Sequence, residues 1–151
     1  MKAHKLFNRI LFPTDFTSSS MDALHYVVEL SGLNEAELYF LHTYRLIDSD
    51  LYGNEIVKAK RLLEQQAMDR FKKWDDDFLK QTKLKYSFNT EVGFISDRIV
   101  SNIQQYDIDL LVLCKSIQDK MKEKSERGYN SLLKDLSCPV MLVPTGEMVK
   151  A

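Results

Sequence analysis

Asp109-Leu110-Leu111-Val112-Leu113 and Cys138-Pro139-Val140-Met141-Leu142-Val143-Pro144 are the two apolar runs that decide the fold of this chain. Neither run alternates with polar residues, which predicts strands buried on both faces, as in a parallel sheet covered by helices. A polar connector from Lys115 to Ser137 separates them, and we expect a helix near residues 127–136 within it. Ligands of parallel α/β sheets bind where the chain leaves the carboxyl end of a strand. The connector is therefore the first place to look for a functional site.

A nucleotide bound at this connector would need glycine there. Backbone N–H groups must approach phosphate oxygens closely, and a side chain obstructs that approach. The connector holds one glycine, Gly128, late in the segment. The pattern therefore indicates the scaffold of a nucleotide binder with an altered phosphate-binding segment.

The rest of the chain alternates apolar strands with amphipathic helices. Ile10-Leu11-Phe12 predicts a buried first strand that ends at Pro13, and residues 37–43 predict a second. Residues 86–92 alternate apolar with polar side chains, which is typical of a strand at a sheet edge. Apolar residues at helical spacing predict helices over about 21–32 and 54–82 and a third that starts near Ser96. This order predicts right-handed crossovers, a parallel sheet and one α/β domain over residues 1–151.

Three helix ends carry recognisable signals. Ser19 and Asp22 have the spacing of a capping box at the start of the first helix. Gly32 stands where that helix should end, because glycine readily adopts the left-handed conformation of a helix C-terminus. Ser96 is expected to cap the third helix.

Composition narrows the function classes. The chain has 151 residues, 44% hydrophobic and 28% charged, with a net charge of −1, which fits one globular domain. Non-specific nucleic-acid binding needs a basic surplus, so we expect no nucleic-acid partner. No apolar run approaches the ~20 residues of a membrane span, and the amino terminus lacks a signal-peptide pattern. We therefore expect a cytoplasmic protein without membrane contact.

Side chains that commonly perform catalysis or bind metals show no motif. The two cysteines, Cys114 and Cys138, form no Cys-x-x-Cys pair, and the three histidines lack zinc spacing. No nucleophile elbow is present either. We therefore expect no metal site and no catalytic residue. Cys114 beside Lys115 could be a reactive thiol, but a buried inert cysteine is the commoner outcome.

Several segments, in order, resemble the universal stress protein family. They are Ile10-Leu11-Phe12-Pro13-Thr14-Asp15-Phe16, Ala36-Glu37-Leu38-Tyr39-Phe40-Leu41-His42, Val92-Gly93 and the two apolar runs quoted above. The match spans nearly the whole chain. The resemblance implies a five-stranded parallel sheet of order 3-2-1-4-5 with helices on both faces, and usually a homodimer. Many members of the family bind ATP, and others do not.

The ATP-binding members carry Gly-x2-Gly-x9-Gly-Ser/Thr after the fourth strand, and this chain departs from that motif. The first glycine falls on Cys114 and the second on Ile117. The third falls on Arg127 counting forward, or on Glu126 counting back from Cys138-Pro139, and Gly128 lies nearby. Each replacement adds a Cβ where phosphate oxygens would approach. Asp15, which the family places at the adenine and ribose end, is retained; alternatively, it forms an Asp turn with its own backbone. The resemblance implies a candidate nucleotide site of Pro13, Thr14, Asp15, Thr43, Leu113, Cys114, Lys115, Ile117, Arg127 and Gly128.

Two functional hypotheses follow, with a weaker third. The first is a non-enzymatic stress-response protein without a cofactor, which does not bind ATP tightly and acts through homodimerisation and contacts with an unknown protein partner. An apolar last strand at a sheet edge is usually paired or covered, so the expected dimer interface is Val140, Met141, Leu142 and Val143.

The second hypothesis is an adenine-nucleotide sensor that binds ATP or AMP with Mg²⁺ and has weak ATPase activity. Cations such as Lys115 and Arg127 would then replace backbone amides as phosphate ligands. The third is redox sensing at Cys114. In all three, the charged segment 115–127 is expected to be a loop that is disordered without a ligand.

Overall fold

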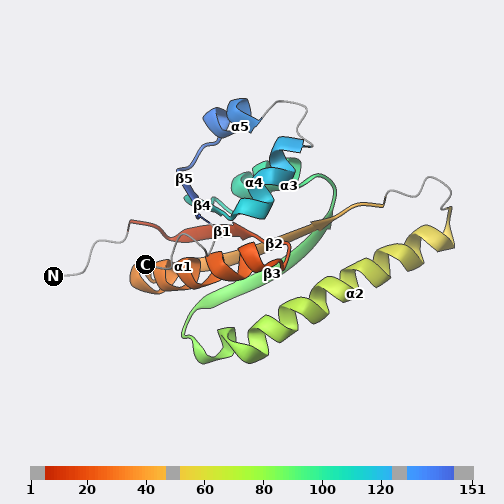
Figure 1. Cartoon of the computed structure of the whole chain (residues 1–151), viewed down its shortest axis with the longest axis horizontal. Coiled ribbons are helices and arrows are strands. Elements are labelled where there is room, and N and C mark those ends of the chain that lie inside the picture. The colour runs from red at the N-terminus through yellow and green to blue at the C-terminus, as the bar shows by residue number, and fades with distance from the viewer. Residues whose placement is uncertain (1–5, 47–51, 124–128, 145–151) are drawn as a thin grey trace.

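The computed structural model describes residues 6–46, 52–123 and 129–144, and their strands form one parallel sheet of order β3-β2-β1-β4-β5 (Figure 1). This confirms the expected fold class and strand order. The strands are β1 (Arg9–Pro13), β2 (Glu37–Tyr44), β3 (Lys85–Val92), β4 (Leu110–Leu113) and β5 (Val140–Leu142). The helices are α1 (Ser18–Asn34), α2 (Asn54–Asp77), the short 3₁₀ helix η1 (Leu79–Gln81), α3 (Ile95–Gln105), α4 (Lys115–Glu123) and α5 (Tyr129–Asp135).

Helices cover both faces of the sheet, with α1 and α2 on one side and α3 and α5 on the other (Figure 1). The alternation of side chains along β2 assigns the two faces. Phe40 packs edge-on against Phe71 of α2, with ring centroids 5.1 Å apart. Its neighbour Tyr39 points the other way and stacks on Tyr106 at the end of α3, at 5.2 Å.

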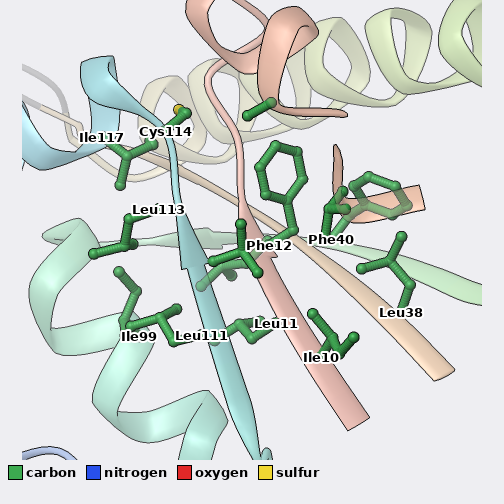
Figure 2. Close-up of a cluster of buried hydrophobic side chains, with 14 of the residues drawn as sticks. Ile10, Leu11, Phe12, Leu38, Phe40, Ile99, Leu111, Leu113, Cys114 and Ile117 are labelled. Atoms are coloured by element: carbon green, nitrogen blue, oxygen red, sulfur yellow. The ribbon is translucent and has the colours of Figure 1, made fainter. Parts of the chain in front are cut away.

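The two central strands form the core, as their apolar sequences predict. Leu11 and Phe12 of β1 and Leu111 and Leu113 of β4 have no exposed surface, and Figure 2 shows them in the buried cluster between the helical layers. The prediction of burial on both faces is wrong for the edge strand β5, which spans only three residues. Its residues Met141 and Leu142 are 38% and 50% exposed.

Three helix ends differ from the sequence prediction. Thr17 caps α1, rather than Ser19, and its hydroxyl accepts a hydrogen bond from the Ser20 N–H. The helix continues past Gly32, and Glu35 takes the left-handed conformation with φ of 51°. The N–H groups of Glu35 and Ala36 bond back to the last turn of α1, so hydrogen bonding holds this C-cap without glycine. The cap expected at Ser96 was also wrong: Phe94 is the N-cap residue of α3 and makes no side-chain cap.

The largest correction concerns the connector after β4. Residues 115–123, expected to be a disordered loop, form α4, which starts directly after the strand. Ile117 and Met121 lie one helical turn apart and are 2% and 0% exposed, so burial of this pair stabilises the helix. α4 contacts both α1 and α3 and therefore lies at the carboxyl end of the sheet between helices of the two layers. Arg127 and Gly128 lie outside the described residues.

Candidate functional site

Asp15 lies just after β1, at the point where the strand order reverses between β1 and β4. One carboxylate oxygen, Oδ1, accepts hydrogen bonds from the N–H of Thr17 at 3.2 Å and from its hydroxyl at 2.6 Å. The Ser20 hydroxyl donates a third bond at 2.8 Å. Both donors belong to the start of α1, so the Asp turn positions the carboxylate beside the helix N-terminus, where negative charge is favoured.

α4 closes over this carboxylate from the other side. The Lys120 ammonium lies 3.0 Å from Oδ2 of Asp15, whose side chain is only 7% exposed. The hydroxyls of Thr17 and Ser116 are 3.0 Å apart. The backbone N–H of Ser116 donates to the Ser19 hydroxyl at 3.1 Å. The first turns of α1 and α4 are thus tied together across the crevice in which open parallel sheets bind their ligands.

The electrostatics of this crevice favour the ion pair. Burial raises the pKa of Asp15, but hydrogen bonds from neighbouring side chains, led by Thr17 and Lys120, outweigh burial and hold the pKa well below its usual range. The pKa of a second side chain near this crevice, His42 near the end of β2, is also lowered. Burial lowers the pKa of His42 to about 4, and the charges of Lys120 and Arg70 act in the same direction. At neutral pH the crevice therefore holds a carboxylate, an ammonium and a neutral imidazole.

Most of the described candidate residues at the end of β4 and the start of α4 are buried. Leu113 is fully buried, and Cys114 is 1% exposed. The Cys114 sulfur lies 3.3 Å from the Ser20 hydroxyl. Lys115 pairs with Asp119 on its own helix at 2.8 Å, and its side chain is 47% exposed.

The first two strands supply the remaining candidate residues. Pro13 is the last residue of β1, and Thr14 after it is 1% exposed and donates its N–H to the Leu41 carbonyl at 2.8 Å. Thr43 is half-buried near the end of β2. The structure thus brings Asp15 and Cys114 to one place, but closes that place with side chains of the protein itself.

The candidate site predicted from the sequence did not include the side chains that make this closure, Lys120, Thr17 and Ser116. The sequence spacing of two of these residues indicates that they could act together. Ser116 and Lys120 are four residues apart, which places both on one face of a helix once the segment is taken as helical. Treating the segment as a loop concealed that spacing.

Other kinds of site are not apparent in the described part of the chain. Residues 6–46, 52–123 and 129–144 contain no group of three or more His, Cys, Asp or Glu residues placed to hold a metal ion. Among the same residues, no helix combines the length and apolar character needed to cross a bilayer.

The parallel sheet of order β3-β2-β1-β4-β5 with helices on both faces defines a Rossmann-like α/β domain. The sequence profile of the universal stress protein family matches residues 6–144, and the chain belongs to this family. No curated protein sequence gives a significant match.

Solved structures of the family share the fold. The universal stress protein UspA from Lactobacillus plantarum superposes with a TM-score of 0.65 at 17% identity, covering 91% of this chain and 97% of that one. An Arabidopsis thaliana family protein with AMP bound has a TM-score of 0.63 at 12% identity, covering 95% of each chain. A universal stress protein in complex with cAMP has a TM-score of 0.59 at 19% identity, covering 93% and 98%.

Proposed function

We propose that this protein is a non-enzymatic universal stress protein that does not bind ATP tightly and acts through homodimerisation and contacts with other proteins. The observation that carries the proposal is the closed crevice. α4 starts directly after β4 and buries Ile117 and Met121 where a glycine-rich segment would have to approach phosphates. Lys120 neutralises Asp15, which is the one acidic group retained from the family's nucleotide site.

A nucleotide could enter only at a cost. The ligand would have to break the ion pair between Lys120 and Asp15 and displace buried apolar side chains of α4. Exposing those side chains to water is unfavourable, so binding energy would be spent on opening the protein. Tight ATP binding is therefore not expected, although AMP and cAMP are bound in structures of two distant relatives.

The sheet edge supports the dimer part of the proposal. Within the described residues β5 pairs only with β4, and its side chains Met141 and Leu142 are 38% and 50% exposed. An unpaired apolar edge favours pairing with another strand. Val140 is partly buried, whereas Val143 is 4% exposed and packs inside the protomer, so Met141 and Leu142 would supply most of the apolar contact.

Calorimetric titration of the purified, nucleotide-stripped chain with ATP and Mg²⁺, with AMP in parallel, tests the proposal. We expect no heat of binding and no thermal shift with either ligand. Micromolar ATP binding that is lost in Asp15→Ala and retained in Asp119→Ala, a control on the exposed side of α4, would contradict it. That result would establish the alternative, an adenine-nucleotide sensor. Sedimentation velocity on the same sample tests the dimer, and a monomer at micromolar concentration would refute that part.

A further inference from the structure

β3 is the longer of the two outer strands of the sheet, with eight residues against three in β5. Within the described residues it pairs only with β2. Gly93, just after β3, donates its backbone N–H to the Tyr44 carbonyl at the end of β2. Because backbone groups alternate in direction along a strand, the odd-numbered residues of β3 hydrogen-bond to β2 and the even-numbered ones turn away from it. The N–H and C=O groups of residues 86, 88 and 90 therefore form an edge that a further strand could join.

The side chains of β3 alternate between the two faces of the sheet. The Phe88 ring stacks on Phe71 of α2 with centroids 4.4 Å apart, so the even-numbered side chains face α2. Glu91 accepts a hydrogen bond from Asn102 of α3 at 2.9 Å, so the odd-numbered side chains face the opposite way. On that second face the edge carries an exposed lysine, Lys85, at one end and the carboxylate of Glu91 at the other.

This charge pattern makes β3 complementary to itself in an antiparallel arrangement. When two copies pair about a two-fold axis at Phe88, Lys85 of one copy lies opposite Glu91 of the second, and Ser87 lies opposite Asn89. Phe88 then forms a hydrogen-bonded pair with its counterpart, as its outward backbone groups require. The lysine and the glutamate belong to a non-hydrogen-bonded pair, in which side chains come closest and opposite charges stabilise the sheet.

One flank of α2 lies on the same side of the molecule as this edge. The Tyr86 hydroxyl of β3 donates to Asp75, so the flank that carries Asp75 points towards the outside of β3. Met68 is two helical turns from Asp75 and therefore lies on the same flank, where it is 48% exposed. An apolar side chain thus stands beside the open strand edge.

This flank of α2 is also complementary to itself. Met68 is one turn from Phe71, which covers Phe88, so a two-fold axis at Phe88 passes close to Met68. Glu64 and Lys72 lie one turn to either side of Met68, and Lys72 is 70% exposed. Two antiparallel copies of α2 centred on Met68 therefore place Glu64 of each copy opposite Lys72 of the other. The strand and the helix indicate the same partner and the same axis.

We propose that β3 and this flank of α2 form a self-association surface, at which two copies join their sheets antiparallel and pack α2 against α2. Lys85 makes the edge selective, because a lysine disfavours pairing with any strand that lacks an acidic residue opposite it. The surface is at the other edge of the sheet from β5, so copies joined at both edges would continue one sheet from protomer to protomer. Exposed charge pairs contribute little each, so we expect a weak contact with a Kd of about 0.1–1 mM.

Sedimentation equilibrium of the full-length Leu142→Glu chain tests the proposal, because this background disables the interface proposed at β5. We expect a monomer–dimer equilibrium between about 20 µM and 1 mM, a range that brackets the expected Kd. Lys85→Glu should weaken it about tenfold or more, since two like-charged pairs replace two opposite ones. Glu91→Lys should do the same, and mixing the two variants should restore association, because each copy then supplies the charge that the other needs. Lys73→Glu, the same charge change on another flank of α2, should have no effect.

Cysteine pairing provides a second measurement that does not alter the charges. In the same background, Ser87→Cys and Asn89→Cys chains should form a mixed disulfide when oxidised together, because non-hydrogen-bonded pairs bring Cα atoms to about 4.5 Å. Each chain oxidised alone should form much less. A monomer throughout the concentration range would overturn the proposal. Association unchanged by Lys85→Glu, or no preference for the mixed disulfide, would place the contact elsewhere and overturn it as well.

Discussion

The replacement of Ile117 by alanine measures directly whether α4 is part of the core. Ile117 is 2% exposed and contacts the buried layer at the end of β4 (Figure 2). Truncating a fully buried isoleucine costs about 2–4 kcal/mol, through lost apolar burial and the cavity left behind. Alanine is a better helix former than isoleucine, so the change cannot weaken α4 through helix propensity. For a chain of this length the loss corresponds to a fall in melting temperature of roughly 4–16 °C.

Urea unfolding followed by circular dichroism provides the free energy of unfolding for wild type and variant. Asp119→Ala is the control, because Asp119 lies on the same helix, is 51% exposed and forms a surface ion pair with Lys115. That change should cost about 0.5 kcal/mol or less. If Ile117→Ala also costs less than about 0.5 kcal/mol, residue 117 is not packed in the core. The argument for a closed crevice then fails.

Three further predictions concern pH, the sheet edge and the end of α1. Folding lowers the pKa of His42 from 6.5 to about 4, so its stabilising contribution should be complete above pH 6.5 and be lost as the pH falls towards 4. The pKa of Asp15 is lowered from 3.8, so protonation of Asp15 should cause a further loss of stability below pH 3.8. Equal unfolding free energies at pH 7 and pH 4.5 would contradict the prediction for His42. Leu142→Glu places a charge on the exposed edge strand and should shift sedimentation towards the monomer, whereas a dimer of unchanged affinity would exclude β5 as the interface. Glu35→Gly should stabilise the protein by about 0.5–1 kcal/mol, because Glu35 has a φ of 51°, which glycine adopts more readily. Glu35→Ala removes the side chain but keeps the Cβ, and equal stabilities of the two variants would argue against backbone strain at this position.

The fold was predictable because its signals are local and mutually consistent. The continuous apolar runs that contain Leu11 and Leu111 form the two central strands, and the alternating residues of β3 form an edge strand, as these patterns predict. The apolar run of β5 is the exception, because it forms the other edge. Helix ends were less predictable, since neighbouring residues offer similar chemistry. Thr17 and Ser19 can both cap a helix, and the turn made by Asp15 selects Thr17.

The candidate site was predictable only in part. Asp15 and Cys114 could be found in the sequence because they occupy positions of a family motif. The ion pair of Asp15 with Lys120 joins segments far apart in the chain, and no local pattern indicates it. The helical nature of residues 115–123 was concealed because the resemblance places a glycine loop there. The spacing of Ile117 and Met121 was the contrary signal.

The burial of α4 also has an evolutionary consequence. A descendant of this protein with a glycine-rich phosphate loop would need glycine in place of Ile117. Each step towards it would remove buried contacts or weaken the helix before any ligand could compensate. The intermediates would be less stable than either end point, and selection removes unstable proteins. The glycine motif is therefore hard to introduce into this protein by single substitutions. New functions are more accessible at surfaces that α4 does not hold closed.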